Sequence, residues 1–274
     1  MSRAGRGLVL AGAAVFALAP VYWILLTAFR PREEIFRHPP ALVPTRITLE
    51  PVRHVWLGSA TNEPILPFLG SSLLVSTAAT VLATAVGVLA AYALGRSGAS
   101  TGRLSFWILS QRFLPPVALI VPLFVLFRDL GLFDTHAGLV FLYAGFNIPM
   151  AVWLLIGFVE GLPAEAEEAA LLDGASPRQV FWHVALPLLR PGLAVTAIFT
   201  FLFSWNEYLC AYQLTADRAA TVPVYLPRLR SAVAELYGEI AAAALFSVLP
   251  ALVFAGVLER HLARGLTLGG ERER

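Results

Sequence analysis

The sequence contains no lysine, and all twenty of its basic residues are arginine. A P-loop nucleotide-binding site needs a lysine that reaches the phosphates. This chain is therefore not a P-loop ATPase, and any ATP hydrolysis that drives it belongs to another subunit. Cysteine is almost absent as well. Cys210 is the single one, so no disulfide forms within the chain, and we interpret it as a buried free thiol.

Charged residues are scarce, and those present do not group into a reaction centre. Only 14% of the residues are charged, whereas a soluble domain carries about 25%. The five histidines are scattered without metal-ligand spacing, and no Ser/His/Asp grouping has a basis in the sequence. We predict no catalytic, metal-binding or cofactor-binding residues. A membrane-embedded hydrolase would need paired acids or a histidine within its apolar segments, and no such pair occurs.

Apolar residues make up 58% of the chain and gather in blocks of about 20, the length of a membrane-spanning helix. Because lipid satisfies no backbone polar group, each block is expected to be helical. The sequence thus predicts an all-α polytopic membrane protein. Its six expected transmembrane helices are residues 7–29, 67–94, 104–127, 138–158, 188–209 and 240–262. The first has the basic flank of a signal peptide, but its length favours a retained helix.

Two loops lie on one face of this arrangement. Residues 30–66 are rich in proline, which forbids a long helix and indicates an extended surface loop. Residues 211–239 form the second loop on the same face. Six spans put both termini on one side, but arginine is divided almost evenly between the two faces. Arginine bias therefore does not set the orientation.

Residues 162–187, between the fourth and fifth spans, predict a helix–turn–helix. Pro163 opens a first, acidic helix, and Gly174 allows the turn that ends it. Ser176 and Gln179 have the spacing of a capping box for a second helix. Val180, Phe181, Val184 and Leu188 are expected to form its exposed apolar ridge. The hairpin either lies on the membrane surface or docks onto a protein, and its acidic first helix favours a protein.

A longer motif runs through this loop, with fixed positions at Glu168-Ala169-Ala170, Gly174, Val184 and Leu186-Pro187. It resembles the EAA loop of bacterial ABC importer permeases, in which isoleucine is common at the position of Val184. Other segments resemble the carbohydrate-uptake branch, and above all its maltose-transporter-type second permease: 112–116, 121–124, 130–135, 205–208 and 265–267. Two features depart from that pattern. Ser71-Ser72 replaces an Asn-Ser pair, and the tail lacks a lysine-containing stretch.

The resemblance implies a single permease domain over residues 1–274 of a bacterial inner-membrane protein. It places both termini, the coupling loop 162–187 and the tail 263–274 in the cytoplasm, and loop 30–66 outside. Glu168, Ala169, Ala170, Gly174, Leu186 and Pro187 would couple the chain to an ATPase. The implied partners are a second homologous permease in a heterodimer, a cytoplasmic ABC ATPase dimer that binds ATP and Mg, an extracytoplasmic solute-binding protein and the lipid bilayer, with no nucleic acid.

Four polar residues in or near the spans are candidates for the translocation path or its gate: Arg112, Asn147, Asn206 and Glu207. Polar groups within a span are costly and usually functional. Each has another interpretation. Glu207, with Asn206 beside it in the fifth span, could anchor the helix at the membrane interface. Arg112 could reach the lipid headgroups, and Asn147 could form a hydrogen-bonded bridge between helices.

The function implied is a non-enzymatic transport subunit, which forms half of an alternating-access path for a sugar or sugar-like solute. A polyol or glycerol-phosphate-type solute is an alternative, because such systems share these motifs. An ion-gradient-driven secondary transporter is less favoured, since the inverted repeats and broken helices of both halves are not found in the sequence.

Overall fold

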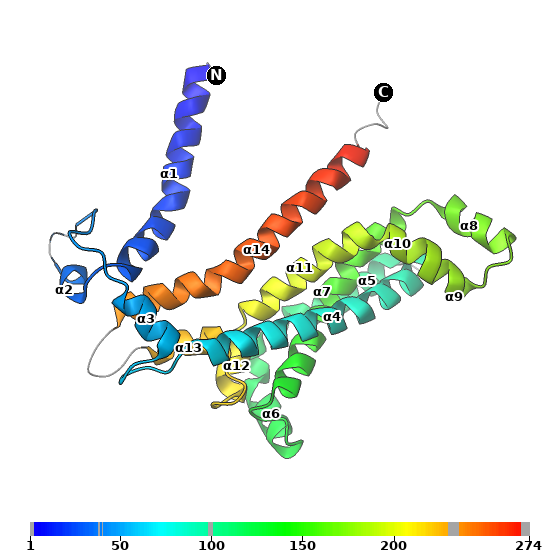
Figure 1. Cartoon of the computed structure of the whole chain (residues 1–274). Coiled ribbons are helices and arrows are strands. Elements are labelled where there is room, and N and C mark those ends of the chain that lie inside the picture. The colour runs from blue at the N-terminus through cyan, green and yellow to red at the C-terminus, as the bar shows by residue number, and fades with distance from the viewer. Residues whose placement is uncertain (1–2, 38, 40, 98–100, 230–235, 270–274) are drawn as a thin grey trace. The chain divides into compact units, whose positions relative to one another are not determined.

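The computed structural model describes residues 3–37, 39, 41–97, 101–229 and 236–269. Within these ranges all regular secondary structure is helical, which confirms the predicted all-α class (Figure 1). Three helices are each long and apolar enough to cross a bilayer: α1 (Arg3–Ala28), α4 (Leu66–Arg96) and α7 (His136–Glu160). They coincide, apart from a few residues at their ends, with the first, second and fourth predicted spans.

The third predicted span is two helices rather than one. After α5 (Thr101–Ser110), a single 3-10 turn, η1 (Gln111–Phe113), leads to α6 (Pro116–Asp129), and the two arms are bent by 78°. Leu114 and Pro115 are both extended, with ψ of 119° and 125°. Each precedes a proline, which disfavours helical ψ. The proline pair therefore breaks the span.

The fifth predicted span, 188–209, is shorter than expected. It begins after a 72° bend between Pro177–Leu188 and Arg190–Trp205, and α11 (Arg190–Trp205) then ends. Asn206 follows as the C-cap, and a separate helix, α12 (Leu209–Leu214), comes after it. Asn206 and Glu207 therefore lie in a break between helices, which corrects their placement within a continuous span.

The sixth predicted span falls within α14 (Tyr237–Gly269), of which residues Tyr237–Val253 are apolar. The predicted tail, 263–274, begins as a continuation of this helix. Its last residues, 270–274, lie outside the described part of the chain.

Loop 30–66 is not extended throughout, although it contains no long helix. It includes α2 (Arg32–Ile35) and α3 (Glu50–Leu57), with Pro51 in the first turn of α3, where its missing N–H costs nothing. Arg30 is only 2% exposed and donates from Nη2 to the carbonyl of Ala41 at 2.5 Å. The second predicted loop, 211–239, includes α13 (Val222–Arg228). Its residues 230–235 are outside the described ranges.

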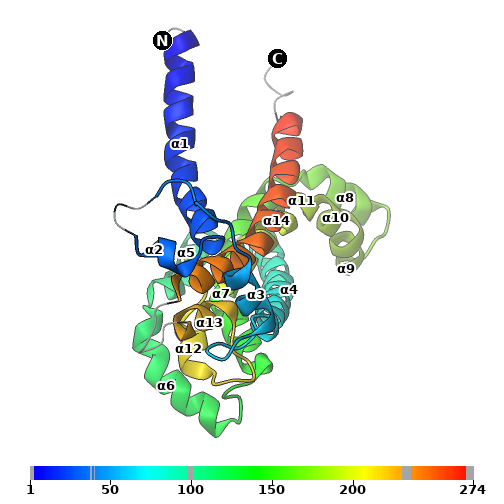
Figure 2. The same ribbon diagram turned by 60° about the vertical axis from the view of Figure 1, so that its left-hand side comes forward.

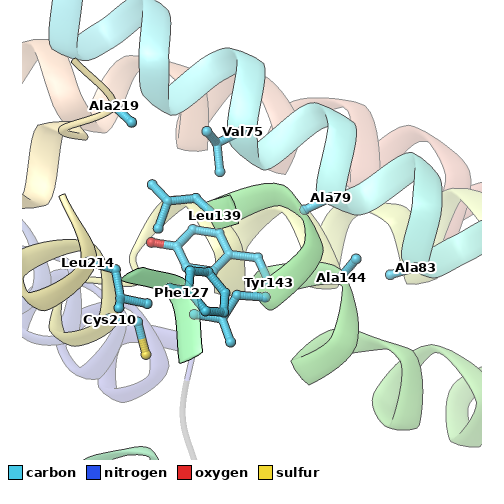
Figure 3. Packing of buried hydrophobic residues seen from close by; sticks show 11 residues of the cluster. Val75, Ala79, Ala83, Phe127, Leu139, Tyr143, Ala144, Cys210, Leu214 and Ala219 are labelled. Atoms are coloured by element: carbon cyan, nitrogen blue, oxygen red, sulfur yellow. The ribbon is translucent and has the colours of Figure 1, made fainter. Parts of the chain in front are cut away.

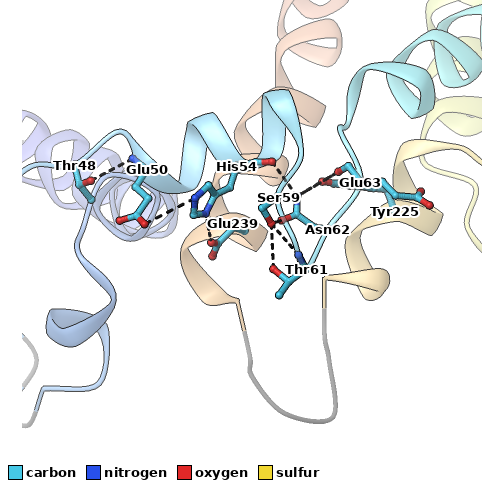
Figure 4. Close-up of polar contacts among 9 residues, drawn as sticks. All are labelled: Thr48, Glu50, His54, Ser59, Thr61, Asn62, Glu63, Tyr225 and Glu239. Carbon is cyan, nitrogen blue, oxygen red and sulfur yellow. Dashed lines mark hydrogen bonds and ion pairs between the residues drawn. The ribbon is translucent and has the colours of Figure 1, made fainter.

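The chain divides into two compact units. The first comprises Met1–Gly70 and Thr221–Pro250, and the second comprises Ser71–Ala220 and Ala251–Arg274. In the first unit, His54 on α3 lies between two carboxylates, 3.1 Å from Glu239 and 3.8 Å from Glu50 (Figure 4). The Tyr225 hydroxyl donates to the carbonyl of Glu63 at 2.8 Å. These contacts attach the loop helices to the start of α14 and to α13.

In the second unit, α4, α7 and α11 form the core. One cluster of buried side chains surrounds Tyr143, where Val75 and Ala79 of α4 face Leu139 and Tyr143 of α7 (Figure 3). A second cluster joins α4 and α7 to the segment that precedes α11. Helices α8 (Ala164–Leu172) and α9 (Pro177–Val180) project from the end of this core at which α4 finishes (Figures 1 and 2).

Close packing between α4 and α7 depends on Gly87. A Cβ atom at this position would lie 2.7 Å from the Cβ of Ala151 and 3.3 Å from its carbonyl carbon. Small residues at such a crossing let two helices approach closely, which is how helices associate in lipid. Movement of α4 against α7 is therefore limited by direct contact.

Candidate functional site: an internal cavity and a helix–turn–helix

A cavity of about 400 Å³ opens within the second unit, and polar and aromatic side chains line it. The broken third span supplies one wall, α7 a second, and α11 together with Glu207 a third. The lining side chains include Arg112, Tyr143, Asn147, Phe203, Ser204 and Glu207. Three of the four predicted path residues are thus brought together, and Asn206 does not line the cavity.

Arg112 lies in the cavity wall and contacts two other lining residues. It is half-buried, its Nη1 donates to the Asn147 side-chain oxygen at 3.3 Å, and its guanidinium lies 4.3 Å from the centre of the Phe203 ring. A cation over an aromatic face is stabilised by the ring quadrupole. Within the described residues it has no carboxylate partner, and it lines the cavity.

Asn147 joins two helices of the core. It is 4% exposed, and its side-chain amide donates to the Ser204 hydroxyl at 3.0 Å. That hydroxyl in turn donates to the carbonyl of Thr200 at 2.9 Å. The bridging interpretation is therefore confirmed, while contact with a substrate stays a prediction. A signal for Ser204 was present in the sequence, because Thr196, Thr200 and Ser204 repeat every four residues along one face of α11.

Glu207 is held by three donors at the break between α11 and α12. Its carboxylate accepts from the Tyr143 hydroxyl at 2.9 Å and from the backbone N–H groups of Cys210 and Ala211 at 3.0 and 3.1 Å. The two backbone contacts cap the start of α12, where the helix dipole favours a negative charge. Asn206 is exposed and its side-chain amide donates to the carbonyl of Leu202 at 2.8 Å. The pair thus ends one helix and starts the next.

The segment 162–187 folds as the predicted helix–turn–helix. Pro163 is the N-cap of α8 rather than its first residue. Gly174 has φ of +89°, a value that L side chains rarely adopt, and its N–H donates to the carbonyl of Leu171. The capping box of Ser176 and Gln179 is present at the start of α9.

The second arm of this segment differs from the expected ridge. Phe181–Ala185 form a π-helical turn, η2, and Leu186–Leu188 form α10. Val180 and Phe181 are buried and Val184 is half-buried. Leu188 is exposed, as predicted, and so is Trp182. The apolar ridge therefore packs largely inward, which corrects the prediction of an exposed face.

The predicted coupling residues divide between surface and interior. Glu168, Ala169 and Gly174 are exposed, and Ala170 is half-buried. Leu186 and Pro187 are also half-buried, and Leu186 packs against the buried cluster between α4 and α7. At the tip of α8, Leu172 is 89% exposed.

Glu167 is the residue of this segment that sequence reasoning missed. It is 8% exposed, and its carboxylate accepts from Nη2 of Arg96 at 2.6 Å and from the Tyr92 hydroxyl at 2.9 Å. In the sequence it is one of three glutamates in an acidic helix, and nothing local sets it apart.

Comparison with known proteins defines the class. The chain belongs to the family described as "binding-protein-dependent transport system inner membrane component", whose model matches residues 50–268. It is thus the permease subunit of an ATP-driven importer and not an enzyme, with ATP hydrolysis in a separate subunit, and the resemblance drawn from the EAA loop is confirmed.

Among relatives, the trehalose transport system permease protein SugB of Mycobacterium tuberculosis is 36% identical over 93% of this chain and 92% of that protein. The inner membrane ABC transporter permease protein YcjP of Escherichia coli is 32% identical over 98% and 96%. The trehalose/maltose transport system permease protein MalG of Thermococcus litoralis is 30% identical over 93% and 92%. A chain of a bacterial ABC transporter involved in alginate import has the same fold, with a TM-score of 0.77 at 24% identity over 95% of this chain and 98% of that one.

Proposed function

We propose that this permease forms one half of the translocation path for a sugar, and that the cavity around Arg112, Asn147 and Phe203 is part of that path. The cavity carries the proposal, because it brings hydrogen-bonding groups and an aromatic ring together between helices of the second unit. Saccharides have hydroxyls on their edges and apolar C–H faces, so both kinds of group have a use. Relatives named for trehalose, trehalose/maltose and diacetylchitobiose transport support a sugar as the solute.

The polar groups of the cavity differ in how many further hydrogen bonds they can form. A guanidinium has five N–H groups, and that of Arg112 donates one hydrogen bond within the described residues. The Glu207 carboxylate already accepts three. Arg112 therefore has the most N–H groups left to donate to a hydroxyl of the solute. Asn147 is the neighbour that orients its guanidinium. Glu207 keeps the wall of the cavity in place.

We propose six transmembrane helices. Three are the unbroken helices α1, α4 and α7, two are the bent pairs, and the sixth is residues 240–262 of α14. On this topology both termini and the tail 263–274 are cytoplasmic, loop 30–66 is extracytoplasmic, and loop 162–187 is cytoplasmic. The docking role of that loop supports the orientation, since the ATPase it serves is a cytoplasmic protein.

We propose that α8 and the turn after it are the coupling element. Glu168, Ala169, Ala170 and Gly174 would contact the ATPase, and Leu186-Pro187 would tie the element to the spans. Small alanines permit close approach, and the positive φ of Gly174 gives a sharp exit. Closure of an ATPase dimer would move this capped element, and through it the helices around the cavity. Alternating access follows if the solute has different contact energies in the two states.

The proposed assembly contains this chain, a second homologous permease, an ATPase dimer that binds ATP and Mg, and an extracytoplasmic solute-binding protein. No cofactor is assigned to this chain. A neighbour of the same fold, with a TM-score of 0.59, was solved as an alginate transporter in complex with a periplasmic protein bound to an alginate pentasaccharide.

The test is uptake by the purified complex in proteoliposomes, with radiolabelled trehalose, maltose, glycerol and glycerol 3-phosphate as probes. The proposal expects ATP-dependent uptake of a sugar, abolished by Asn147→Ala and preserved in Asn206→Ala, which leaves the cavity intact. Uptake of glycerol or glycerol 3-phosphate alone would support the polyol or glycerol-phosphate alternative. Uptake that does not depend on ATP but depends on an ion gradient would contradict the proposal of an ATP-driven importer.

A further inference from the structure

The end of α4 is joined to the helix–turn–helix by a partly buried ion pair. Arg96 is the last residue of α4, and its Nε and Nη2 donate to both carboxylate oxygens of Glu167 at 2.6 to 3.2 Å. The side chains are 28% and 11% exposed. A bidentate pair of this kind fixes orientation as well as distance, because guanidinium and carboxylate are both planar.

Tyr92 extends this junction to the second arm of the segment. It lies one helical turn before Arg96, and its hydroxyl donates to Glu167 at 2.9 Å. Its ring lies 4.9 Å from the ring of Phe181, in the π-helical turn η2. A short stretch of α4 therefore contacts both α8 and η2. The turn at Gly174 is free at its tip, while the two arms are fixed at their base.

Glu167 and Glu168 are neighbours with different environments. Glu168 is exposed on α8, and Glu167 is 8% exposed and engaged within the chain. Consecutive residues of a helix point about 100° apart, since a turn has 3.6 residues. Glu167 is therefore unavailable to a docking partner, and the two carboxylates have separate tasks.

We propose that Glu167, held by Arg96 and Tyr92, is a positioning residue that passes movement of α8 to α4. The inference rests on the proposed coupling role of α8. From α4 the contact continues to α7, since Gly87 and Ala151 touch at the crossing of the two helices. Helix α7 carries Asn147 into the cavity. Each step is either a direct contact or a path along one helix, and such a contiguous arrangement can carry a coupled movement.

The alternative is that the pair merely stabilises the fold. A buried carboxylate that loses its partner is strongly unfavourable, so destabilisation alone is expected from removing Arg96. The two roles differ in which properties of the complex remain after the ion pair is broken. A structural pair affects assembly and hydrolysis together, whereas a transmitting pair can be broken with the ATPase still bound and active.

The experiment uses the complex purified with its ATPase and reconstituted in liposomes. A single cysteine is placed in the cavity wall as Gln111→Cys in a Cys210→Ala background. Its rate of reaction with a water-soluble maleimide is measured with and without ATP. The variants are Glu167→Gln, Tyr92→Phe and the exchange of charges Arg96→Glu with Glu167→Arg. Glu165→Gln is the matched control, because Glu165 is exposed on the same helix.

We expect Glu167→Gln to retain the ATPase and ATP hydrolysis, while the ATP-induced change in labelling rate falls by about tenfold. Glu165→Gln keeps the full change, and the exchanged pair restores part of it. A full ATP response in Glu167→Gln, or an equal loss in Glu165→Gln, would overturn the inference. Failure of the unmodified chain to retain an ATPase would instead overturn the proposed function.

Glu167→Gln has an amide that no longer matches Arg96, and the variant can fail to assemble. Tyr92→Phe then decides, because it removes a single hydrogen bond and leaves the ion pair in place. A reduced ATP response with normal hydrolysis supports transmission through this junction. An unchanged response in Tyr92→Phe, together with an exchanged pair that assembles but does not respond, contradicts it.

Discussion

Tyr143 on α7 donates a 2.9 Å hydrogen bond to the carboxylate of Glu207, which caps the helix that follows α11. This one contact ties three helices to the same wall of the cavity. Tyr143 is 2% exposed, and it was not among the residues that the sequence singled out. Because Glu207 accepts hydrogen bonds from Tyr143 and from backbone N–H groups, it serves as a structural group of the cavity wall.

Tyr143→Phe tests that contact. The ring stays in place, and Glu207 keeps its backbone donors but loses its side-chain donor. A hydrogen bond to a charged group contributes about 1.5–3 kcal/mol, so the free energy of unfolding is expected to fall by about that amount. Thermal unfolding of the purified protein in detergent measures it. The control is Tyr208→Phe at an exposed position, and equal melting temperatures for both variants and the parent would refute the prediction.

Gly87→Ala tests the crossing of α4 and α7. The added methyl would meet Ala151 at 2.7 Å, so the helices must separate. Overpacking of this kind costs about 1–3 kcal/mol. Gly157→Ala on α7 is the matched control, since a Cβ there meets nothing within 4 Å. We expect a lower melting temperature for the first variant and an unchanged or higher one for the second. The reverse order would show that the crossing is not tight.

Asp134→Asn tests a clamp at the start of α7. Asp134 has φ of +53°, and its carboxylate accepts from four backbone N–H groups of residues 216–219 at 3.0 to 3.3 Å. Burial acts to raise its pKa, but these four donors outweigh burial, so the pKa lies below the ordinary value. Asparagine also tolerates positive φ, so the change removes the charge and keeps the backbone conformation.

The pH dependence of this clamp has a definite sign. A carboxylate with a lowered folded pKa contributes stability above the pKa of an unfolded aspartate, about 3.9, and loses it as pH falls through the folded pKa. We expect Asp134→Asn to melt below the parent at neutral pH and the gap to close in acid. Melting curves across that pH range measure the gap, and a gap that is the same at every pH would contradict the clamp.

Substitutions at Gly174 test whether the backbone conformation of the turn in the proposed coupling element is needed. The site is open, with nothing within 4 Å of an added Cβ, so only the positive φ opposes a side chain. That conformation costs about 1–2 kcal/mol for most residues and less for asparagine. Gly174→Val is expected to lose the co-purifying ATPase, and Gly174→Asn to retain most of it. Equal retention by both variants would show that the turn geometry is irrelevant.

Local chemistry explains what the sequence could predict. The apolar blocks were readable because a bilayer imposes a length on every spanning helix. The turn at Gly174 and the capping box of Ser176 are set by residues three or four apart. The proline pair that breaks the third span also acts on its immediate neighbours.

Packing decides the rest, and it joins residues far apart in the chain. Arg96 and Glu167 are 71 residues apart, and Asn147 and Ser204 are 57 apart. No local pattern pairs them. The end of α11 at Trp205 was also missed, because neither proline nor glycine marks it. The helix stops where Asn206 and Glu207 satisfy backbone groups, a role that depends on where Tyr143 lies.

The central claim is that loop 162–187 meets an ATPase on the inner side of the membrane. The most direct test places a single cysteine at the 89% exposed tip of α8, as Leu172→Cys with Cys210→Ala. The account predicts that a membrane-impermeant maleimide labels it only in inside-out vesicles, and that the bound ATPase slows the reaction. Labelling from the outside of intact cells, or a rate that the ATPase does not change, would contradict it.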